Sequence, residues 1–509
     1  MNAAAADARA LALAQPAAIA VPSATGVEAR VVLAGPAARS LAFVLDWLIR
    51  TSLSVVYLLA AALLIFGDLD FNVTSERETL WYLAGVIPSL AIYFLYHMVL
   101  EPLMSGRTPG KRMIGLRVLT PEGLVPGVGA LITRNVFRLV DSMPVLYVVG
   151  LLATMLGKRH LRIGDLAAGT VLAVERAPFF EKLAAKRSGE SPDAGWFDVR
   201  RRAAALKRRR HPEVHDALGV VDDYRAMARA VGSARIAGAS LAPQAELAEA
   251  TYADLHDVIH RPASRAWLSL WSLFRDRVPA ILRKMRVHLM AVTLLFVASA
   301  IVGWWLVYTY PDLIQMFASE SLIATVERGE LWTEGILHVV PAPELSVSIL
   351  TNNIVVSLFC FCSGLVFGLG TFYMVGLNGL SLGALFAFTA QHDLAGKLFD
   401  FVTAHGCVEL SCICIAGAAG AYMGEALIRP RSRTRSEAFR IAAREAVQVM
   451  VVVVLLLFVC GFIEGYVSPD PEVPRWARVT IGLGYWFFMV SLLRGYVFGR
   501  SRGGEAVPA

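Results

Sequence analysis

Ionisable and amide side chains inside apolar stretches are the residues of this sequence best placed to do chemistry. In the C-terminal half, His405 and Glu409 are four residues apart, so they share one face of a helix. Glu464 ends a later apolar run, and Asn352 and Asn353 open an earlier one. Such groups are typical of a hydrogen-bonded packing cluster, a proton or ion site, or a surface that binds a partner.

A metal centre is the sharpest chemical alternative for these residues. A His–Glu pair can bind a metal ion, but catalytic zinc usually has three protein ligands and a water, and no H-E-x-x-H motif is present. The cysteines are Cys360, Cys362, Cys407, Cys412, Cys414 and Cys460. Their i,i+2 pairs point to different helix faces, so we interpret them as packing residues. We expect no metal, no cofactor and no catalytic residue.

A second set of charges lies in the first apolar stretch. Arg39 and Asp46 are seven residues apart on one helical face, and Arg50 follows Asp46 by four residues, the spacing of an intrahelical ion pair. A charge near mid-membrane costs about 2.5–3.5 kcal/mol on insertion scales, so it usually faces protein or water. We expect Asp46 to pair with Arg39, and Arg50 is the competing partner, as a structural pair or as part of an ion pathway. If Asp165, which returns from the cytoplasmic side, binds Arg39, then Arg50 is left for Asp46.

The elements that position these residues are transmembrane helices. The 509 residues are 56% hydrophobic and only 17% charged, well below the charge content of soluble domains. Eight runs are long enough to cross a bilayer, or nearly so. They are 41–66, 81–100, 289–310, 347–375, 377–390, 406–428, 447–463 and 479–498. Asn378 and Gly379 are expected to form a turn. The fold class is therefore an all-α polytopic helical membrane protein.

The remaining segments suggest two membrane modules. Residues 1–30 read as a disordered leader and 501–509 as a tail. The first module, 31–175, contains two spans and an apolar stretch, 131–156, that Pro144 breaks and that we expect to be re-entrant. A basic cytoplasmic helical linker, 176–286, leads to a six-span second module at 287–500.

The charge distribution predicts the orientation. Basic residues cluster at 107–117, at 200–210 and at 429–440, whereas 312–344 is acidic. Because basic loops stay in the cytoplasm, we expect both termini and the linker inside, and 312–344 outside. A net charge of +7 next to spans favours contact with anionic lipid over nucleic acid.

Two further motifs accompany Arg39 and Asp46. They are Gly-Arg-Thr-Pro-Gly-Lys-Arg at 106–112 and Arg-Ile-Gly-Asp-Leu-Ala-Ala-Gly-Thr-Val at 162–171. With these, the segment 31–175 resembles the RDD family of bacterial membrane proteins. The family name records one Arg and two Asp, which map onto Arg39, Asp46 and Asp165, with Asp141 as the weaker candidate for the second Asp. The resemblance implies a membrane domain, for which cation/proton antiport has been proposed in some members.

The polar residues of the second module carry another resemblance. Asn352, Asn353, His405, Glu409 and Glu464, with Gly-Ala-Ala-Gly at 417–420, resemble the stage II sporulation protein M family over about 289–498. Members take part in assemblies with cell-wall-degrading enzymes during spore engulfment. The pairing with an RDD-like segment departs from the sporulation protein, so the resemblance implies no specific partner.

Three function classes follow from these observations. We expect a non-enzymatic scaffold or assembly subunit of a bacterial envelope complex, located in the plasma membrane. Its partners would be the lipid bilayer and envelope, peptidoglycan-processing or cytoplasmic proteins, with no nucleic acid, and an oligomer is compatible with the sequence. An ion- or proton-coupled transporter is the alternative, and an intramembrane metallohydrolase is a distant third.

Overall fold

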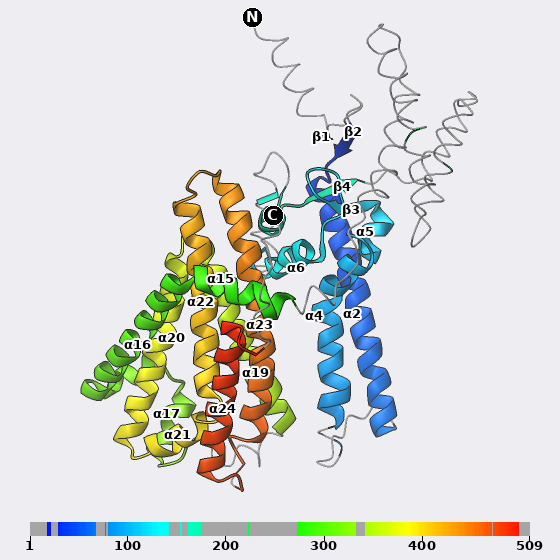
Figure 1. The fold of residues 1–509 in the computed structure, drawn as a ribbon. Coiled ribbons are helices and arrows are strands. Elements are labelled where there is room, and N and C mark those ends of the chain that lie inside the picture. Colours follow the sequence, from blue (N-terminus) through cyan, green and yellow to red (C-terminus); the bar gives the residue numbers. More distant parts are fainter. Residues whose placement is uncertain are drawn as a thin grey trace, which may run out of the picture. The chain divides into compact units, whose positions relative to one another are not determined.

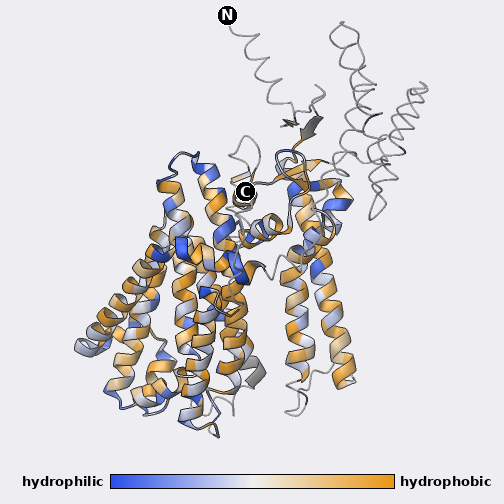
Figure 2. Ribbon diagram, viewed as in Figure 1, coloured by the Kyte–Doolittle hydropathy of each residue, from blue (hydrophilic) through white to orange (hydrophobic). Residues whose placement is uncertain are grey.

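The computed structural model describes residues 18–21, 29–67, 77, 80–141, 153–154, 161–174, 201, 222, 272–331, 342–470 and 472–497. Among them, eight helices are long and apolar enough to cross a membrane, which confirms the predicted all-α polytopic class (Figure 1). Figure 2 shows apolar residues along the long helices and hydrophilic residues gathered toward their ends. Large apolar side chains such as Leu64, 87% exposed, are oriented as lipid-facing residues would be.

The contacts divide the chain into two compact units. The first comprises Met1–Ser52 and Phe94–Ser264, and the second comprises Leu53–Tyr93 and Arg265–Ala509. This division differs from the predicted modules, since part of the first two spans belongs to the second unit. The two helices concerned are α2 (Pro36–Phe66) and the segment formed by η1 (Trp81–Val86) and α4 (Ile87–Leu103).

Short elements pack around the first part of α2 and the last part of α4, which belong to the first unit. In chain order they are α5 (Pro109–Ile114), β3 (Leu116–Leu119), α6 (Val128–Val136), α7 (Arg138–Asp141), α9 (Ile163–Ala168) and β4 (Val171–Val174). Strands β3 and β4 pair in antiparallel register. The Ala34 amide donates to the Leu172 carbonyl at 2.8 Å, so β4 is attached to the start of α2. This attachment brings the preceding helix, α9, close to Arg39.

Among the described residues from 272 to 497, the second unit has six long helices with short connecting elements. They are α16 (Arg286–Thr309), α19 (Ala342–Cys362, continued by η4, Ser363–Leu365), α20 (Leu369–Gln391), α22 (Gly406–Ile428), α23 (Arg435–Tyr466) and α24 (Arg475–Arg494). The connecting elements are η2 (Leu273–Arg277), α15 (Val278–Lys284), η3 (Pro311–Met316), α17 (Glu320–Glu327) and α21 (Ala395–Val402). Helix α22 is central, because it contacts α16, α19, α20, α23 and α24.

Glycines allow the backbones of this unit to touch. A Cβ on Gly379 would lie 2.5 Å from the Phe296 carbonyl oxygen, and one on Gly383 would overlap the backbone of Ala300. Gly364 packs in the same way against Gly420. The Gly364-x-x-x-Gly368 spacing therefore serves contacts within the chain, as small residues commonly do in membrane helices.

The predicted turn at Asn378 and Gly379 is wrong. Both residues lie inside α20, where the Asn378 amide donates to the Met374 carbonyl at 2.7 Å. The break falls instead at Phe367 and Gly368, which both have positive φ. Hydropathy does not mark that position, because Phe367 is as apolar as the helix before it.

Three predicted segments lie partly or wholly outside the described residues. Within the predicted disordered leader, β1 (Ala18–Val21) pairs with β2 (Ala29–Val32), so these β-branched and small residues are ordered as a strand pair. In the apolar stretch 131–156, α6 ends at Val136 and α7 begins at Arg138. Pro144 and most of the linker 176–286 lie outside the described residues.

Candidate functional site

Asp46, in the part of α2 that belongs to the first unit, is 1% exposed. Its carboxylate accepts hydrogen bonds from the Tyr96 hydroxyl at 3.0 Å, the Thr108 hydroxyl at 2.5 Å and the Gly110 amide at 2.9 Å. The structure thus gives Asp46 neutral donors from α4 and from the start of α5. The pairing of Asp46 with Arg50 stays a prediction. Several donors to one carboxylate are an effective way to bury its charge.

The Thr-Pro-Gly-Lys motif forms the first turn of α5. Thr108 is the N-cap and accepts from the Lys111 amide at 3.4 Å, while Pro109 occupies the first helical position. Position 110 must be glycine, because a Cβ there would lie 2.7 Å from the Ala42 carbonyl oxygen. The motif is therefore a helix start that docks onto Asp46.

A second carboxylate, Glu101 of α4, is fully buried. It forms a very close ion pair with Lys111, and its other oxygen accepts from the Asn135 amide at 3.0 Å. Arg134 Nε lies 3.7 Å from the same oxygen. Glu101 thereby joins α4, α5 and α6.

Asp165 of α9 is the meeting point of the arginines. Its Oδ2 lies 2.8 Å from Arg39 Nη1, so the predicted pairing of Arg39 with Asp165 is present. Its Oδ1 forms a very close ion pair with Arg134. The Arg162 amide donates to Oδ2 at 3.3 Å, which caps the start of α9.

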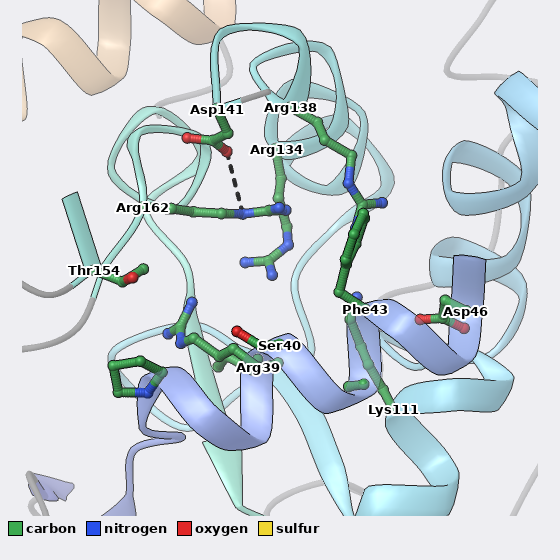
Figure 3. Close-up of a pocket in the computed structure, with 13 residues that line it drawn as sticks. Arg39, Ser40, Phe43, Asp46, Lys111, Arg134, Arg138, Asp141, Thr154 and Arg162 are labelled. Atoms are coloured by element: carbon green, nitrogen blue, oxygen red, sulfur yellow. Dashed lines mark ion pairs between the residues drawn. The ribbon is translucent and has the colours of Figure 1, made fainter. Parts of the chain in front are cut away.

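Asp141 completes this group at the end of α7. It accepts from the Ile163 amide at 3.1 Å and lies 3.4 Å from Arg162 Nε. Figure 3 shows Asp141 facing Arg162, with Arg39 and Arg134 directed toward the same space. We call the seven ionic groups the charged network. They are Arg39, Glu101, Lys111, Arg134, Asp141, Arg162 and Asp165.

A cavity of about 180 Å³ lies beside the charged network. It is lined by Pro36, Arg39, Ser40, Ala42, Phe43, Asp46, Lys111, Arg134, Arg138, Asp141, Thr154, Arg162 and Leu172 (Figure 3). Burial lowers the pKa of Lys111 to about 7, although the Glu101 carboxylate acts in the opposite direction. Burial and the neighbouring Arg162 also lower the pKa of Arg134.

In the second unit, the predicted His405 and Glu409 pair acquires a third member. His405 Nε2 lies 3.8 Å from Glu409 Oε2 and 3.4 Å from Glu464 Oε1. His405 precedes α22, Glu409 lies in its first turn, and Glu464 lies near the end of α23. One donor atom from each residue lies within 4.8 Å of the others, a spacing that a metal ion could bridge. We call these three residues the His–Glu cluster.

The two asparagines predicted to accompany this cluster form no hydrogen bond with it in the described residues. Asn353 is 6% exposed, and Asn352 is exposed on α19. In the part of the chain that the structure describes, no hydrogen bond joins either side chain to His405, Glu409 or Glu464.

Sequence reasoning missed several site residues. His97, whose Nε2 lies 3.7 Å from Asp46, and Glu101 both sit at the end of an apolar run, where polar residues usually face the headgroups. The signal that could have found them is their spacing. His97 and Glu101 are four residues apart in α4, so they share the helical face that lies toward Asp46. Arg134 and Asn135 gave no signal beyond lying in a stretch of mixed polarity.

Comparison with known families agrees with this division of sites. Residues 33–169 match the RDD family, and residues 292–469 match Stage II sporulation protein M. The chain is therefore a fusion of an RDD-family segment with a segment of the Stage II sporulation protein M family, and it is an integral membrane protein. No curated protein and no solved structure gave a significant match. Asp46 and the charged network fall within the first segment, and the His–Glu cluster falls within the second.

Proposed function

We propose that this multi-pass protein is a non-catalytic scaffold or assembly subunit of a bacterial envelope-associated complex. The observation that supports this best is the packing of the second unit. Helices α16 and α20 approach until Gly303, Gly379 and Gly383 touch the opposite backbone. Such contacts make a rigid body and leave no room for a water-filled path between these two helices.

The charged network supports the same role. Asp165 joins α9 to α2 through Arg39 and to α6 through Arg134. A buried charge in such a position is costly unless it is paired and hydrogen-bonded. These ion pairs therefore hold the helices together.

The proposed location is the bacterial plasma membrane, with both termini in the cytoplasm. The loop between α22 and α23 carries Arg429, Arg431 and Arg433, and basic loops remain inside. The His–Glu cluster lies at the opposite ends of these two helices, toward the extracytoplasmic side. Labelling of single cysteines in a Cys-free chain should mark Asp312→Cys from outside intact cells, and labelling of Arg431→Cys there would contradict this orientation.

An ion- or proton-coupled transporter is the alternative, and the His–Glu cluster is the observation that favours it. Its three ionisable groups are 3%, 19% and 10% exposed for His405, Glu409 and Glu464. Buried ionisable residues in membrane helices commonly mark ion or proton paths.

Cross-linking of the intact, tagged chain in native membranes, followed by purification and mass spectrometry, tests the proposal. A multi-pass protein of equal abundance from the same membrane, carrying the same tag, is the control. Selective enrichment of peptidoglycan-processing enzymes or of a defined cytoplasmic partner is the expected result. Recovery of the chain alone, or of the same proteins as the control, would contradict a scaffold.

A further inference from the structure

The His–Glu cluster brings three hydrogen-bond acceptors together. The Ser468 hydroxyl donates to the Ile463 carbonyl at 3.5 Å, which leaves its oxygen to accept from His405 Nδ1 at 2.9 Å. With the ring proton on Nδ1, the lone pair of Nε2 faces Glu409 and Glu464. An imidazole lone pair and two carboxylates repel one another, so this arrangement calls for a proton or a metal cation between them.

The ring of His405 is held in this orientation from several sides. Phe401 packs edge-on against it with ring centroids 5.5 Å apart. The Cys460 thiol donates to the His405 carbonyl at 3.5 Å, one helical turn before Glu464. Gly461 of α23 packs against Leu350, where a Cβ would lie 2.8 Å from the Leu350 Cβ. Both helices that carry the carboxylates are thus fixed relative to the ring.

The distances favour a metal ion over a shared proton. A hydrogen bond would draw nitrogen and oxygen to about 2.7–3.2 Å, whereas Nε2 lies 3.4 and 3.8 Å from the two carboxylate oxygens. Ligand atoms about 2.1 Å from a tetrahedral ion lie about 3.4 Å from one another. In the described part of the chain, Glu464 Oε2 is buried with no hydrogen-bond partner.

We propose that His405, Glu409 and Glu464 bind a divalent transition-metal cation at the end of the α22–α23 pair. One imidazole and two carboxylates form a ligand set that suits Zn²⁺ or Mn²⁺ better than Cu⁺, which prefers sulfur. Ser468 is a positioning residue that orients the imidazole through Nδ1, as second partners of metal-binding histidines commonly do. The site goes beyond the scaffold role and does not depend on it.

The test uses the full-length chain purified in detergent without a histidine tag. The protein is treated with a chelator, loaded with ZnCl₂ or MnCl₂ alone, desalted and analysed for metal content. The wild-type chain should retain one ion, and Glu464→Gln and Glu409→Gln should lose it. Glu425→Gln is the matched control, because Glu425 also lies in α22 and faces one histidine, His288, at 2.8 Å. That variant should retain the ion.

Ser468→Ala separates a metal site from a packing cluster. All three ligands remain in this variant, so the fold should be kept, while affinity for Zn²⁺ should fall roughly tenfold or more. Retention of equal metal by the wild type and Glu464→Gln, or of none by the wild type, would overturn the proposal. If Glu464→Gln aggregates, X-ray absorption at the Zn edge of the loaded wild type decides. One imidazole with oxygen neighbours is expected, and a sulfur shell or a fully hydrated ion would overturn the site.

Discussion

In the charged network of the first unit each carboxylate faces a cation, whereas in the His–Glu cluster of the second unit the ionisable groups face one another. Glu101 meets Lys111, and Asp165 meets Arg39 and Arg134. His405 meets only carboxylates among its described ionic neighbours. The carboxylates of the first arrangement are paired with cations of the chain, whereas the second arrangement takes its positive charge from the proposed metal ion. Burial alone therefore does not distinguish a structural carboxylate from one in a binding site, whereas the sign of the charges next to the carboxylate does.

The same substitution should act in opposite directions in the two clusters. Glu101→Gln leaves Lys111 buried without its anion and should destabilise the protein by about 3–5 kcal/mol. Glu464→Gln replaces an acceptor with a donor and should stabilise the metal-free protein by about 1 kcal/mol. Thermal unfolding in detergent with chelator measures both.

Exposed and distant carboxylates provide the controls for this pair. Glu122→Gln, in an exposed loop of the first unit, and Glu425→Gln, in the second, should change the unfolding midpoint little. Equal destabilisation by Glu101→Gln and Glu464→Gln would show that the two clusters do not differ in kind.

The docking of α5 onto Asp46 gives a smaller expected effect. Gly110→Ala places a Cβ 2.8 Å from the Asp46 backbone amide nitrogen, and such overpacking should cost about 1–3 kcal/mol. Gly129→Ala in α6 is the control, since nothing lies within 4 Å of its Cβ position, and it should gain about 0.5–1 kcal/mol. Membrane abundance and the unfolding midpoint of the two variants check this. Equal midpoints for both variants would show that the close contact at Gly110 does not affect stability.

The pH dependence of stability gives the smallest effect. The pKa of Lys111 is about 7 in the folded protein, against 10.5 for an ordinary lysine. Between these values the unfolded chain binds more protons, so Lys111 makes stability rise as pH rises from about 7 toward 10. The unfolding midpoint should increase more between pH 7 and 9 in the wild type than in Lys111→Met. Parallel curves for the two proteins would mean that Lys111 stays charged.

Local spacing predicted those parts of the fold and site that depend on near neighbours. Hydropathy finds the eight spans because each must cover the same thickness of lipid. The His405–Glu409 pair follows from helical periodicity, since residues four apart lie on the same face of a helix. The motif at 162–171 indicated Asp165 through a resemblance, and Arg39 was its expected partner.

Tertiary placement was less accessible to the sequence. The four-residue strands β3 and β4 are too short to give an alternation signal, yet they carry α9 to the start of α2. Asp46 takes Thr108, which is 62 residues away, and spacing along one helix can only suggest Arg50. The same limit holds for Glu464: the sequence named it as a candidate, but it meets His405 only because α22 and α23 pack side by side.

Ion flux in proteoliposomes tests the scaffold account most directly. The wild-type chain is reconstituted with a pH-sensitive dye inside the vesicles, and K⁺ or Na⁺ gradients are imposed. Asp46→Asn and Glu409→Gln are reconstituted at equal density, with protein-free vesicles as the baseline. For a scaffold, we expect all three proteins to leave proton movement at the baseline. Cation-dependent proton flux in the wild type that either substitution abolishes, in a protein that still folds, would contradict it and establish transport.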